Sequence, residues 1–221
     1  KYLLDMSIAF PISVTGVWSS YFGDFDPDEI LARSFSRWSV NCRSRYYERI
    51  SAGRGHGQSD DSIRDAIKTQ WQRTGAEARR RGTHMHRQIE LALNRELHDT
   101  SSPEMLQFRK FMEEVIERRR WEIYRTEWSI YDAHRMIAGQ IDAIFFDRVN
   151  DEYHMVDWKR CAKVLDCYES WGQYGVDPCQ DLLDNRFNHY AVQQNLYATL
   201  LEDCYGISLA SMSLVQLHEH Q

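Results

Sequence analysis

The chain has 221 residues, of which 43% are hydrophobic and 27% charged, and its formal net charge is −6. This composition excludes a disordered or fibrous protein and favours one globular domain. No run of about 18 apolar residues is present, so we expect no membrane span. The first residues are too short and too mixed in character for a signal peptide. Proteins that bind nucleic acids are often basic, so the negative charge counts mildly against that class, although a local basic patch would suit it.

The cysteines predict reduced thiols in an intracellular protein, because their number is odd and no C-x-x-C pair occurs. They are Cys42, Cys161, Cys167, Cys179 and Cys204. The chain begins with Lys1 rather than Met. This suggests a piece of a larger protein, whose other domains would be its partners.

Residues 1–75 are predicted to form a mainly helical N-terminal part. Ser13 is placed to cap a short helix, and Asp26-Pro27 predicts the start of a helix over about 26–40. Residues 51–58, SAGRGHGQ, predict a loop, and a helix over about 59–73 follows. Aromatic residues are dense near the N-terminus and would form either a packing cluster or a platform on which unpaired bases stack. They are Phe10, Trp18, Tyr21, Phe22 and Phe25.

Residues 75–96 are predicted to be helical for most of their length. His86 and Glu90 are four residues apart, so they share a helix face. Gly82 would allow a close approach of the backbone to another segment or to a phosphate. A helix that starts near Thr83 would direct its free N–H groups at an anion. Another helix is predicted over about 102–120, because Ser-Pro-Glu is typical of a helix start.

From residue 121 the pattern becomes that of strands, with apolar and polar residues in alternation. Strands are predicted over 121–132, 136–146 and 152–158, joined as an antiparallel meander. Residues 160–181 predict a long loop with a short helix. A helix over about 182–204 would end at Gly206, and a fourth strand is predicted over 207–218.

The predicted hairpin over 139–159 carries two acids where strands that enter a core favour apolar residues. Asp142 lies beside Ile141 and Ala143, and Asp157 follows Val156 and precedes Trp158-Lys159. A buried carboxylate is costly unless it is paired or holds a metal ion. The hairpin therefore predicts a metal site formed by two acids with a lysine beside them.

Further motifs occur in a fixed order around this hairpin. They are Gly82-Thr83-x-x-His86-x-x-x-Glu90, then Glu127, then Asp142 with Asp157-Trp158-Lys159, and finally Gln193-x-x-x-Tyr197. This set resembles the PD-(D/E)XK nuclease superfamily, and its order resembles the RecB-like exonuclease branch, over roughly residues 81–205. The resemblance implies an α/β (α+β) fold with a restriction-endonuclease-like core, in which helices flank a mixed central sheet in the order αβββαβ. The chain would be a single nuclease domain over 1–221, with a helical N-terminal extension over 1–75 and a catalytic core over 76–221.

The resemblance also implies a role for each site residue. One or two Mg²⁺ or Mn²⁺ ions would be held by His86, Asp142, Asp157, Glu127 and the carbonyl of Trp158. Lys159 would act with Asp142 and Asp157 as a catalytic residue, touching the attacking water or the scissile phosphate, and beside a metal its pKa could fall. The residues expected to bind the nucleic acid or to support the site are Gln193, Tyr197, Tyr190, Glu90, Thr83 and Arg81. Some RecB-like nucleases hold an iron–sulfur cluster, but the three closely spaced downstream cysteines are missing here, so we expect none.

Several of these residues have an alternative structural interpretation. Glu127 could be a surface acid paired with Arg125 or Arg135, and Glu90 could pair with Arg87 or Asn94 in the helix. His86 could be a core histidine, and Gln193 with Tyr197 could be ordinary helix packing. The basic runs 79–81, 118–120 and 159–163 could bind a strand or could be solvated helix faces.

Three functions remain open from the sequence. The first is a DNA nuclease of the RecB-like kind, an exonuclease on single strands or DNA ends, with a place in DNA repair or recombination. The second is an RNA endonuclease of the cap-snatching type, which shares a site of His, Asp and acid-x-Lys. The third is a non-catalytic nucleic-acid-binding module of the same fold, which the full set of His86, Asp142, Asp157 and Lys159 argues against.

Overall fold

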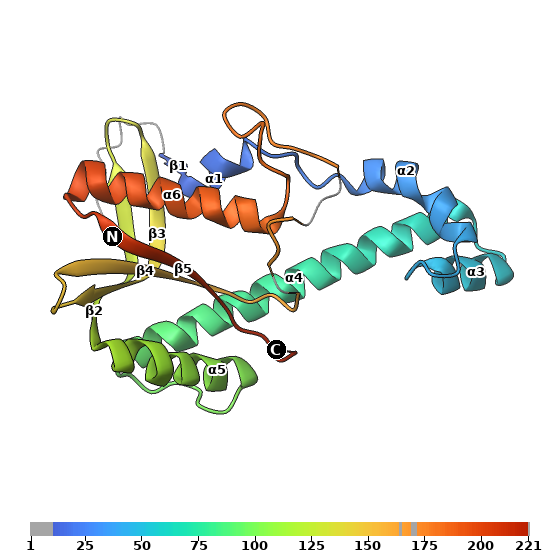
Figure 1. The fold of residues 1–221 in the computed structure, drawn as a ribbon. Helices are drawn as coiled ribbons and strands as arrows, with labels where there is room; N and C mark the ends of the chain where they lie inside the picture. Colours follow the sequence, from blue (N-terminus) through green and yellow to red (C-terminus); the bar gives the residue numbers. More distant parts are fainter. Residues whose placement is uncertain (1–10, 164, 169–171, 221) are drawn as a thin grey trace. The chain divides into compact units, whose positions relative to one another are not determined.

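The computed structural model describes residues 11–163, 165–168 and 172–220. The chain divides into two compact units. One unit runs from Asp24 to Arg81, and the other joins the N-terminal segment up to Gly23 with the chain from Gly82 onwards. Figure 1 follows the chain through its elements by colour.

The larger unit is built on a mixed sheet, to which the described residues contribute five strands. The strands are β1 (Ile12–Ser13), β2 (Trp121–Asp132), β3 (Ile137–Asp147), β4 (Glu152–Lys159) and β5 (Leu209–Gln216). Strands β2, β3 and β4 pair antiparallel in succession, β5 runs parallel to β4, and β1 runs parallel to β3. The predicted meander and the predicted fourth strand are confirmed, and the fold is of the mixed α/β class.

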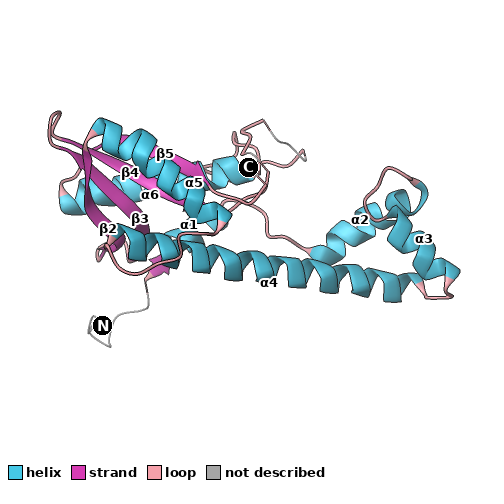
Figure 2. Ribbon diagram, turned by 90° about the horizontal axis from the view of Figure 1, so that it is seen from below, coloured by secondary structure: helices cyan, strands magenta, loops and turns pink. Residues whose placement is uncertain are grey.

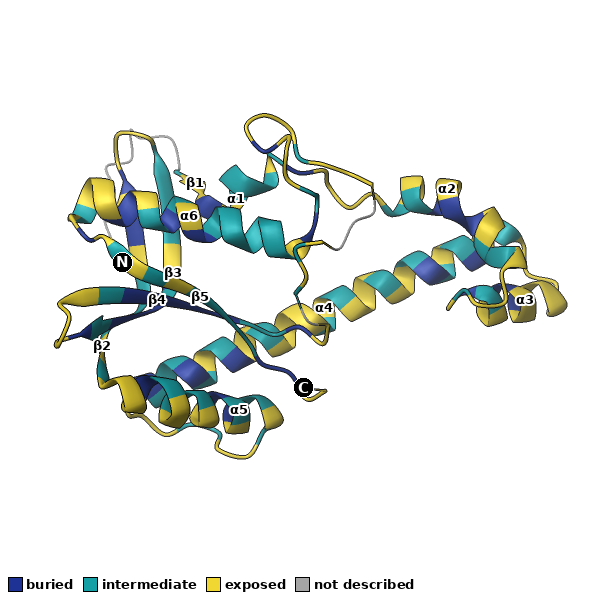
Figure 3. Cartoon of the chain, viewed as in Figure 1, coloured by how far each residue is buried: buried dark blue, intermediate teal, exposed yellow. Residues whose placement is uncertain are grey.

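Helices cover both faces of this sheet, as Figures 1 and 2 show. On one face lie the end of α4 (Asp60–Leu93), α5 (Pro103–Phe111) and the π-helical segment η1 (Met112–Glu117). They pack with Phe145 and Val156 of the sheet in one apolar cluster. The other face is covered by α1 (Val14–Ser19) and α6 (Arg186–Tyr205), in a cluster with Ile144 and Met155. Alternation along β3 therefore supplies both layers of the core. Figure 3 colours the buried residues of the chain dark blue.

Helix α4 is one continuous helix of 34 residues, whereas the sequence suggested two helices with a start near Thr83. Gly82 lies inside it, and a Cβ atom added there would meet no atom within 4 Å. A single glycine costs a helix only about 1 kcal/mol, so neither Gly75 nor Gly82 breaks it. The expected close approach at Gly82 and the free N–H groups at Thr83 are therefore absent.

The unit Asp24–Arg81 is formed by α2 (Pro27–Val40), α3 (Tyr47–Gly55) and the first part of α4. The predicted start of α2 is confirmed, because the Asp26 side chain accepts bonds from the N–H groups of Asp28 and Glu29 at 2.8 and 3.1 Å. The expected loop over 51–58 is shorter than predicted, since α3 extends through Gly55 and only 56–58 of that range lie outside a helix. The helix lies tight against α4: a Cβ atom at Gly53 would come within 2.8 Å of Ile63.

The remaining boundaries are close to those predicted. Helix α6 begins at Arg186 rather than near 182, because the Asn185 side chain caps it through the N–H of Asn188 at 2.8 Å. It ends at Gly206, which has the left-handed φ of 65° expected of such a stop. No helix occurs in the described residues between β4 and α6, so the short helix expected there is not found. Of the helices that the structure describes, none is both long and apolar enough to cross a membrane.

Candidate metal centre

Three carboxylates lie side by side across the sheet, each on a different strand. The pairs Thr126–Ala143 and Trp128–Ile141 place Glu127 of β2 opposite Asp142 of β3. The β3–β4 ladder ends at the pair Ala143–Val156, and its next step places Asp142 opposite Asp157. Residues directly opposite in a sheet have Cβ atoms about 5 Å apart, so the charges of this carboxylate row interact strongly.

His86 reaches this row from α4. Its Nδ1 atom lies 3.4 Å from Asp142 Oδ1 and 3.9 Å from Glu127 Oε1. The three residues offer ligand atoms that all lie within 4.8 Å of one another. Glu127 is held by Gln140, whose side-chain amide donates to Glu127 Oε2 at 2.8 Å. Of the two arginines that could have paired with Glu127, Arg135 pairs instead with Asp132 and Asp203, and Arg125 lies over the Tyr124 ring.

The β3–β4 ladder ends where the Asp142 side chain replaces a backbone acceptor. The N–H of Trp158 donates to Asp142 Oδ2 at 2.8 Å. A strand residue directs its N–H and C=O to the same neighbour, so the Trp158 carbonyl faces this gap as well. The Trp158 ring points elsewhere, into the core, where Phe108 and Phe111 meet it edge-on at 5.3 and 5.4 Å.

Asp157 and Lys159 form a close pair on β4. Lys159 Nζ lies 2.6 Å from Asp157 Oδ2, yet that buried oxygen accepts no aligned hydrogen bond from the described residues. The ammonium also lies 4.7 Å from the centre of the Tyr190 ring, which belongs to α6. The side chains of both Asp157 and Lys159 are largely buried, at 7% and 15% exposed.

The electrostatics favour protons or cations at the row. Burial and the charge of Asp142 raise the pKa of Glu127 to about 7. Burial and the charge of Asp142 likewise raise the pKa of Asp157, although Lys159 opposes the shift. Glu127 and Asp157 are therefore harder to ionise than they would be alone, because each has an anionic neighbour and water is partly excluded.

The pKa values of the two basic groups of the site are also raised, which for these groups favours the charged form. Burial alone would lower the pKa of His86, but the Asp142 carboxylate outweighs it and raises the pKa. Burial also opposes the charge of Lys159, yet Asp157 and Asp142 raise its pKa above the usual value. Lys159 is therefore an ammonium ion at neutral pH in this arrangement.

This donor set suits a divalent cation. One imidazole nitrogen and two carboxylates converge, a third carboxylate lies beside them, and Glu127 and Asp157 resist ionisation without a counter-charge. Mg²⁺ and Mn²⁺ both take carboxylate oxygens, and Mn²⁺ accepts imidazole more readily. His86, Glu127 and Asp142 are the residues that already lie within reach of one ion, with Asp157 beside them.

Gln193 and Tyr197 project together from α6, and Gln193 Nε2 donates to the Tyr197 hydroxyl at 3.2 Å. Burial raises the pKa of Tyr197, and the nearby charges of Asp157 and Asp142 add to the effect. Tyr197 packs on Gly139 so tightly that a Cβ atom there would lie 2.5 Å from its ring. Neither Gly139 nor Gln140 was singled out from the sequence, since only the register of β2 with β3 and the approach of α6 reveal them.

The other expected residues lie outside the row. Glu90 pairs with Arg87 at 2.6 Å, although its charge contributes to the raised pKa of Glu127. Thr83 is exposed in mid-helix, and Arg81 pairs with Glu77 at 2.7 Å. Arg160 is bound to Glu104 and Glu219 at 2.7 and 3.2 Å, which gives it a structural role rather than a place in a basic patch.

The aromatic residues near the N-terminus form packing contacts. Trp18 stacks on His189 of α6 at 4.9 Å, and Phe22 meets the same ring at 4.3 Å. Phe25 packs edge-on against Trp71 at 5.5 Å, within the unit Asp24–Arg81. Phe10 lies outside the described residues.

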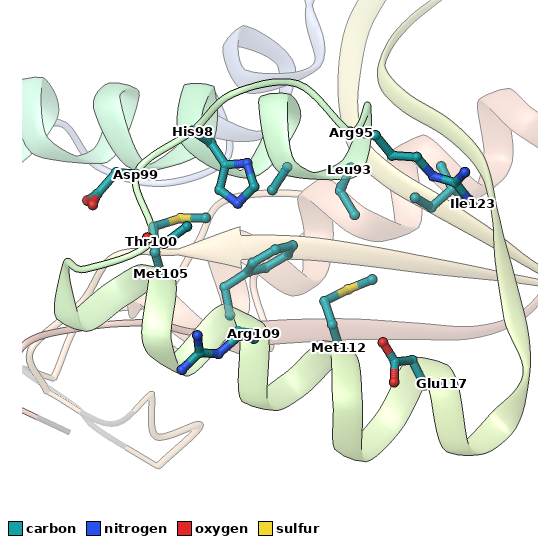
Figure 4. Close-up of a pocket in the computed structure, with 12 residues that line it drawn as sticks. Leu93, Arg95, His98, Asp99, Thr100, Met105, Arg109, Met112, Glu117 and Ile123 are labelled. Atoms are coloured by element: carbon teal, nitrogen blue, oxygen red, sulfur yellow. The ribbon is translucent and has the colours of Figure 1, made fainter.

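A pocket of about 360 Å³ is separate from the carboxylate row (Figure 4). It lies between the end of α4, the loop after it, α5 and the start of β2. Leu93 and Met112 face each other across it, and Arg95 and Arg109 lie at its edge. None of the expected site residues lines this pocket.

A scan against protein-family models finds no family that matches this chain, and a search of curated proteins finds no relative.

Proposed function

We propose that this chain is a metal-dependent nuclease that hydrolyses DNA phosphodiester bonds, with a PD-(D/E)XK active site of the RecB-like kind. The observation that carries the proposal is the convergence of His86, Glu127, Asp142 and the pair Asp157–Lys159 from four separate elements. A structural ion pair would need only one acid and one base. Three acids opposite one another, with a histidine and a lysine at their edge, are costly unless they hold cations.

In this proposal His86, Glu127, Asp142, Asp157 and the Trp158 carbonyl hold Mg²⁺ or Mn²⁺. When bound, such an ion activates a water molecule and stabilises the charge that develops on the scissile phosphate. Asp142 has a second task, because its Oδ2 atom holds the Trp158 N–H and so keeps β4 at a fixed distance from β3. Gln140 orients Glu127 toward the row.

Lys159 contributes a positive charge at the site. Because its pKa is raised, the ammonium suits a contact with a phosphate oxygen better than the removal of a proton from water. Asp157 and the Tyr190 ring hold the ammonium from two sides. The pair of Gln193 and Tyr197 lies on the same helix as Tyr190 and would contact the strand or brace the lysine.

The proposed substrate is DNA, as single strands or ends. The test offers labelled DNA and RNA strands of one sequence with Mn²⁺, Mg²⁺ or a chelator, to the full chain and to Asp157→Asn. We expect metal-dependent cleavage of DNA from its ends, and no cleavage by Asp157→Asn, because a neutral amide loses the charge that attracts the metal.

Each other outcome has a defined meaning. Cleavage of RNA alone would replace this proposal with an RNA endonuclease. Normal turnover by a folded Asp157→Asn would remove Asp157 from the active site. Binding of strands without cleavage in any metal would leave a non-catalytic module and refute the enzyme.

A further inference from the structure

A second group of possible metal ligands lies at the closed end of the β3–β4 hairpin. Asp147 and Glu152 are direct cross-strand partners, and His154 follows two residues later on the same face of β4. The three residues offer ligand atoms within 4.8 Å of one another. Asp142 and Asp147 are five residues apart on β3, which is about 17 Å along a strand, so this group is distinct from the carboxylate row.

His154 supplies an independent sign of a missing ligand. The residue is only 5% exposed. Its Nδ1 atom is bonded to Ser211 Oγ at 2.8 Å, while its buried Nε2 atom has no hydrogen-bond partner among the described residues. The nearest acid atom, Glu152 Oε2, lies 3.9 Å away, which is too far for a hydrogen bond. A buried nitrogen atom without a hydrogen-bond partner is rare in native proteins, so the His154 Nε2 atom is expected to bind a ligand.

The imidazole is also held rigidly in this position. Trp121 stacks on it with the ring centres 3.7 Å apart and the planes 9° from parallel. The Trp121 Nε1 atom donates to Asp147 Oδ2 at 3.3 Å, so the same residue orients the acid. A bond from the second ring nitrogen is the usual way in which a metal-ligating histidine is oriented. Here Ser211 provides it, and Trp121 fixes the plane.

We propose that Asp147, Glu152 and His154 bind a divalent transition-metal ion of the zinc class, which bridges β3 and β4 at the closed end of the hairpin. His154 Nε2 would be the nitrogen ligand, and Glu152 and Asp147 would each give a carboxylate oxygen. Asp147 Oδ1 is occupied by the N–H groups of Val149 and Asn150. Asp147 Oδ2 accepts from Asn150 Nδ2 at 2.9 Å and from Trp121 Nε1 at 3.3 Å. The longer bond, to Trp121, is the one that the ion would replace.

The ligand chemistry selects this ion class. Zn²⁺ is usually four-coordinate and accepts imidazole and carboxylate together, so three protein ligands leave one position for a water molecule. Mg²⁺ prefers six oxygen ligands and is disfavoured where an imidazole is one of only three protein ligands. The proposal does not depend on nuclease activity, because the ion would be structural.

The test measures binding of ZnCl₂ and of Co²⁺, alone, by the full chain. Two other histidine-containing groups are first removed by His86→Ala and by His220→Ala, since His218, Glu219 and His220 also cluster. On this background we expect one equivalent of Zn²⁺ and a visible Co²⁺ absorption band. Glu152→Gln should lower the affinities for Zn²⁺ and for Co²⁺ at least tenfold. The Glu152 side chain is half-exposed, so this substitution should not unfold the chain.

Glu122→Gln is the matched control. It removes the same charge from the neighbouring strand β2, where Glu122 pairs with Arg148 rather than with the cluster. It should bind Zn²⁺ as the background does. Zn²⁺ should also raise the melting temperature of the background and of Glu122→Gln but not of Glu152→Gln. Equal Zn²⁺ affinity and equal thermal shifts in both variants would overturn the proposal.

Discussion

Asp142 is the residue on which the carboxylate row depends, because it is the middle one of three acids. Two unit charges about 5 Å apart at an effective dielectric constant of 20 repel by on the order of 3 kcal/mol. The Asp142 charge contributes to the raised pKa of both Glu127 and Asp157. It also raises the pKa of His86 and Lys159, so one carboxylate sets the charge state of the whole site.

Substitution of Lys159 distinguishes a role in catalysis from a role in metal binding. Lys159→Met should lower turnover about 100-fold or more, because it removes a charge aimed at the phosphate. Metal affinity should stay the same or rise, since a competing cation is lost from beside Asp157. The measurements are single-turnover cleavage and Mn²⁺ titration, with Lys110→Met on α5 as the control. Loss of metal binding equal to that of Asp157→Asn would contradict this role.

The raised pKa of Glu127 predicts how stability depends on pH. Its usual pKa of 4.5 rises to about 7 on folding. Between these values the folded chain keeps a proton that the unfolded chain releases. Stability from this group is therefore complete below pH 4.5 and is lost as the pH rises through 7. The shifts of Asp157 and His86 have the same sign.

We expect the metal-free chain to lose on the order of 2 kcal/mol of stability between pH 5 and pH 8 from Glu127. Mn²⁺ should restore this stability. The gain should be larger at pH 8 than at pH 5, because protons compete with the ion for the same carboxylate oxygens at low pH. Denaturant unfolding with a chelator or with Mn²⁺ measures both. Glu127→Gln should flatten the metal-free profile, and an unchanged profile in that variant would refute the assignment.

The acids on the hairpin could be predicted from the sequence because each interrupts an apolar strand. The neighbours that hold them could not. Gln140 reaches Glu127 only because β2 and β3 pair in one particular register. The Trp158 N–H finds Asp142 only because the ladder between β3 and β4 stops at Ala143.

At the scale of elements, the contact between α6 and β3 positions the Gln193–Tyr197 pair. Gly139 lies beneath Tyr197 and Val14, and a Cβ atom would come within 2.5 and 2.9 Å of them. The glycine is needed for this close approach rather than for its backbone angles. Any side chain at residue 139 must push α6 outward.

Gly139→Ala should therefore cost about 1–3 kcal/mol of stability and reduce turnover while sparing metal affinity. Gly82→Ala is the matched control for stability, because its added Cβ would meet nothing within 4 Å and would favour the helix by about 1 kcal/mol. Chemical unfolding of both variants measures the difference. A Gly139→Ala chain as stable as the parent would show that α6 is not packed as described.

Sequence signals at helix ends predicted helix boundaries correctly, because capping depends only on nearby residues. Sequence patterns failed to predict a helix that depends on contacts with residues far away in the chain. Asp26-Pro27 and Gly206 marked the ends of α2 and α6, because caps act within a turn. Helix α3 was missed, because its glycine-rich sequence is helical only where Ile50 is buried and Gly53 meets Ile63. Tertiary packing overrode propensity there.

At the scale of the whole molecule, the net charge of −6 is divided unevenly between the two units. The unit Asp24–Arg81 carries eleven arginines and one lysine against nine acids, a net charge of +3. The remainder of the chain therefore carries −9. Within this unit a groove of about 560 Å³ is lined by Arg49 and Arg73 together with Thr69, Gln70 and Thr74. Its lining offers donors to phosphate without any acid.

If the chain acts on DNA, this groove should hold the strand backbone. Arg49→Gln with Arg73→Gln should weaken the affinity for a labelled single strand about tenfold at low salt. It should also make the slope of log affinity against log salt shallower by about 1 to 2. The reason is that binding releases fewer counterions from the DNA when two phosphate contacts are lost. Anisotropy titrations at several salt concentrations, with a chelator to prevent cleavage, measure both the affinity and the slope.

Arg148→Gln, on the acidic unit and paired with Glu122, is the control and should leave both quantities unchanged. An equal loss in Arg148→Gln would mean that total charge matters and the groove does not, whereas an unaltered slope in the double variant would remove the groove from strand binding altogether.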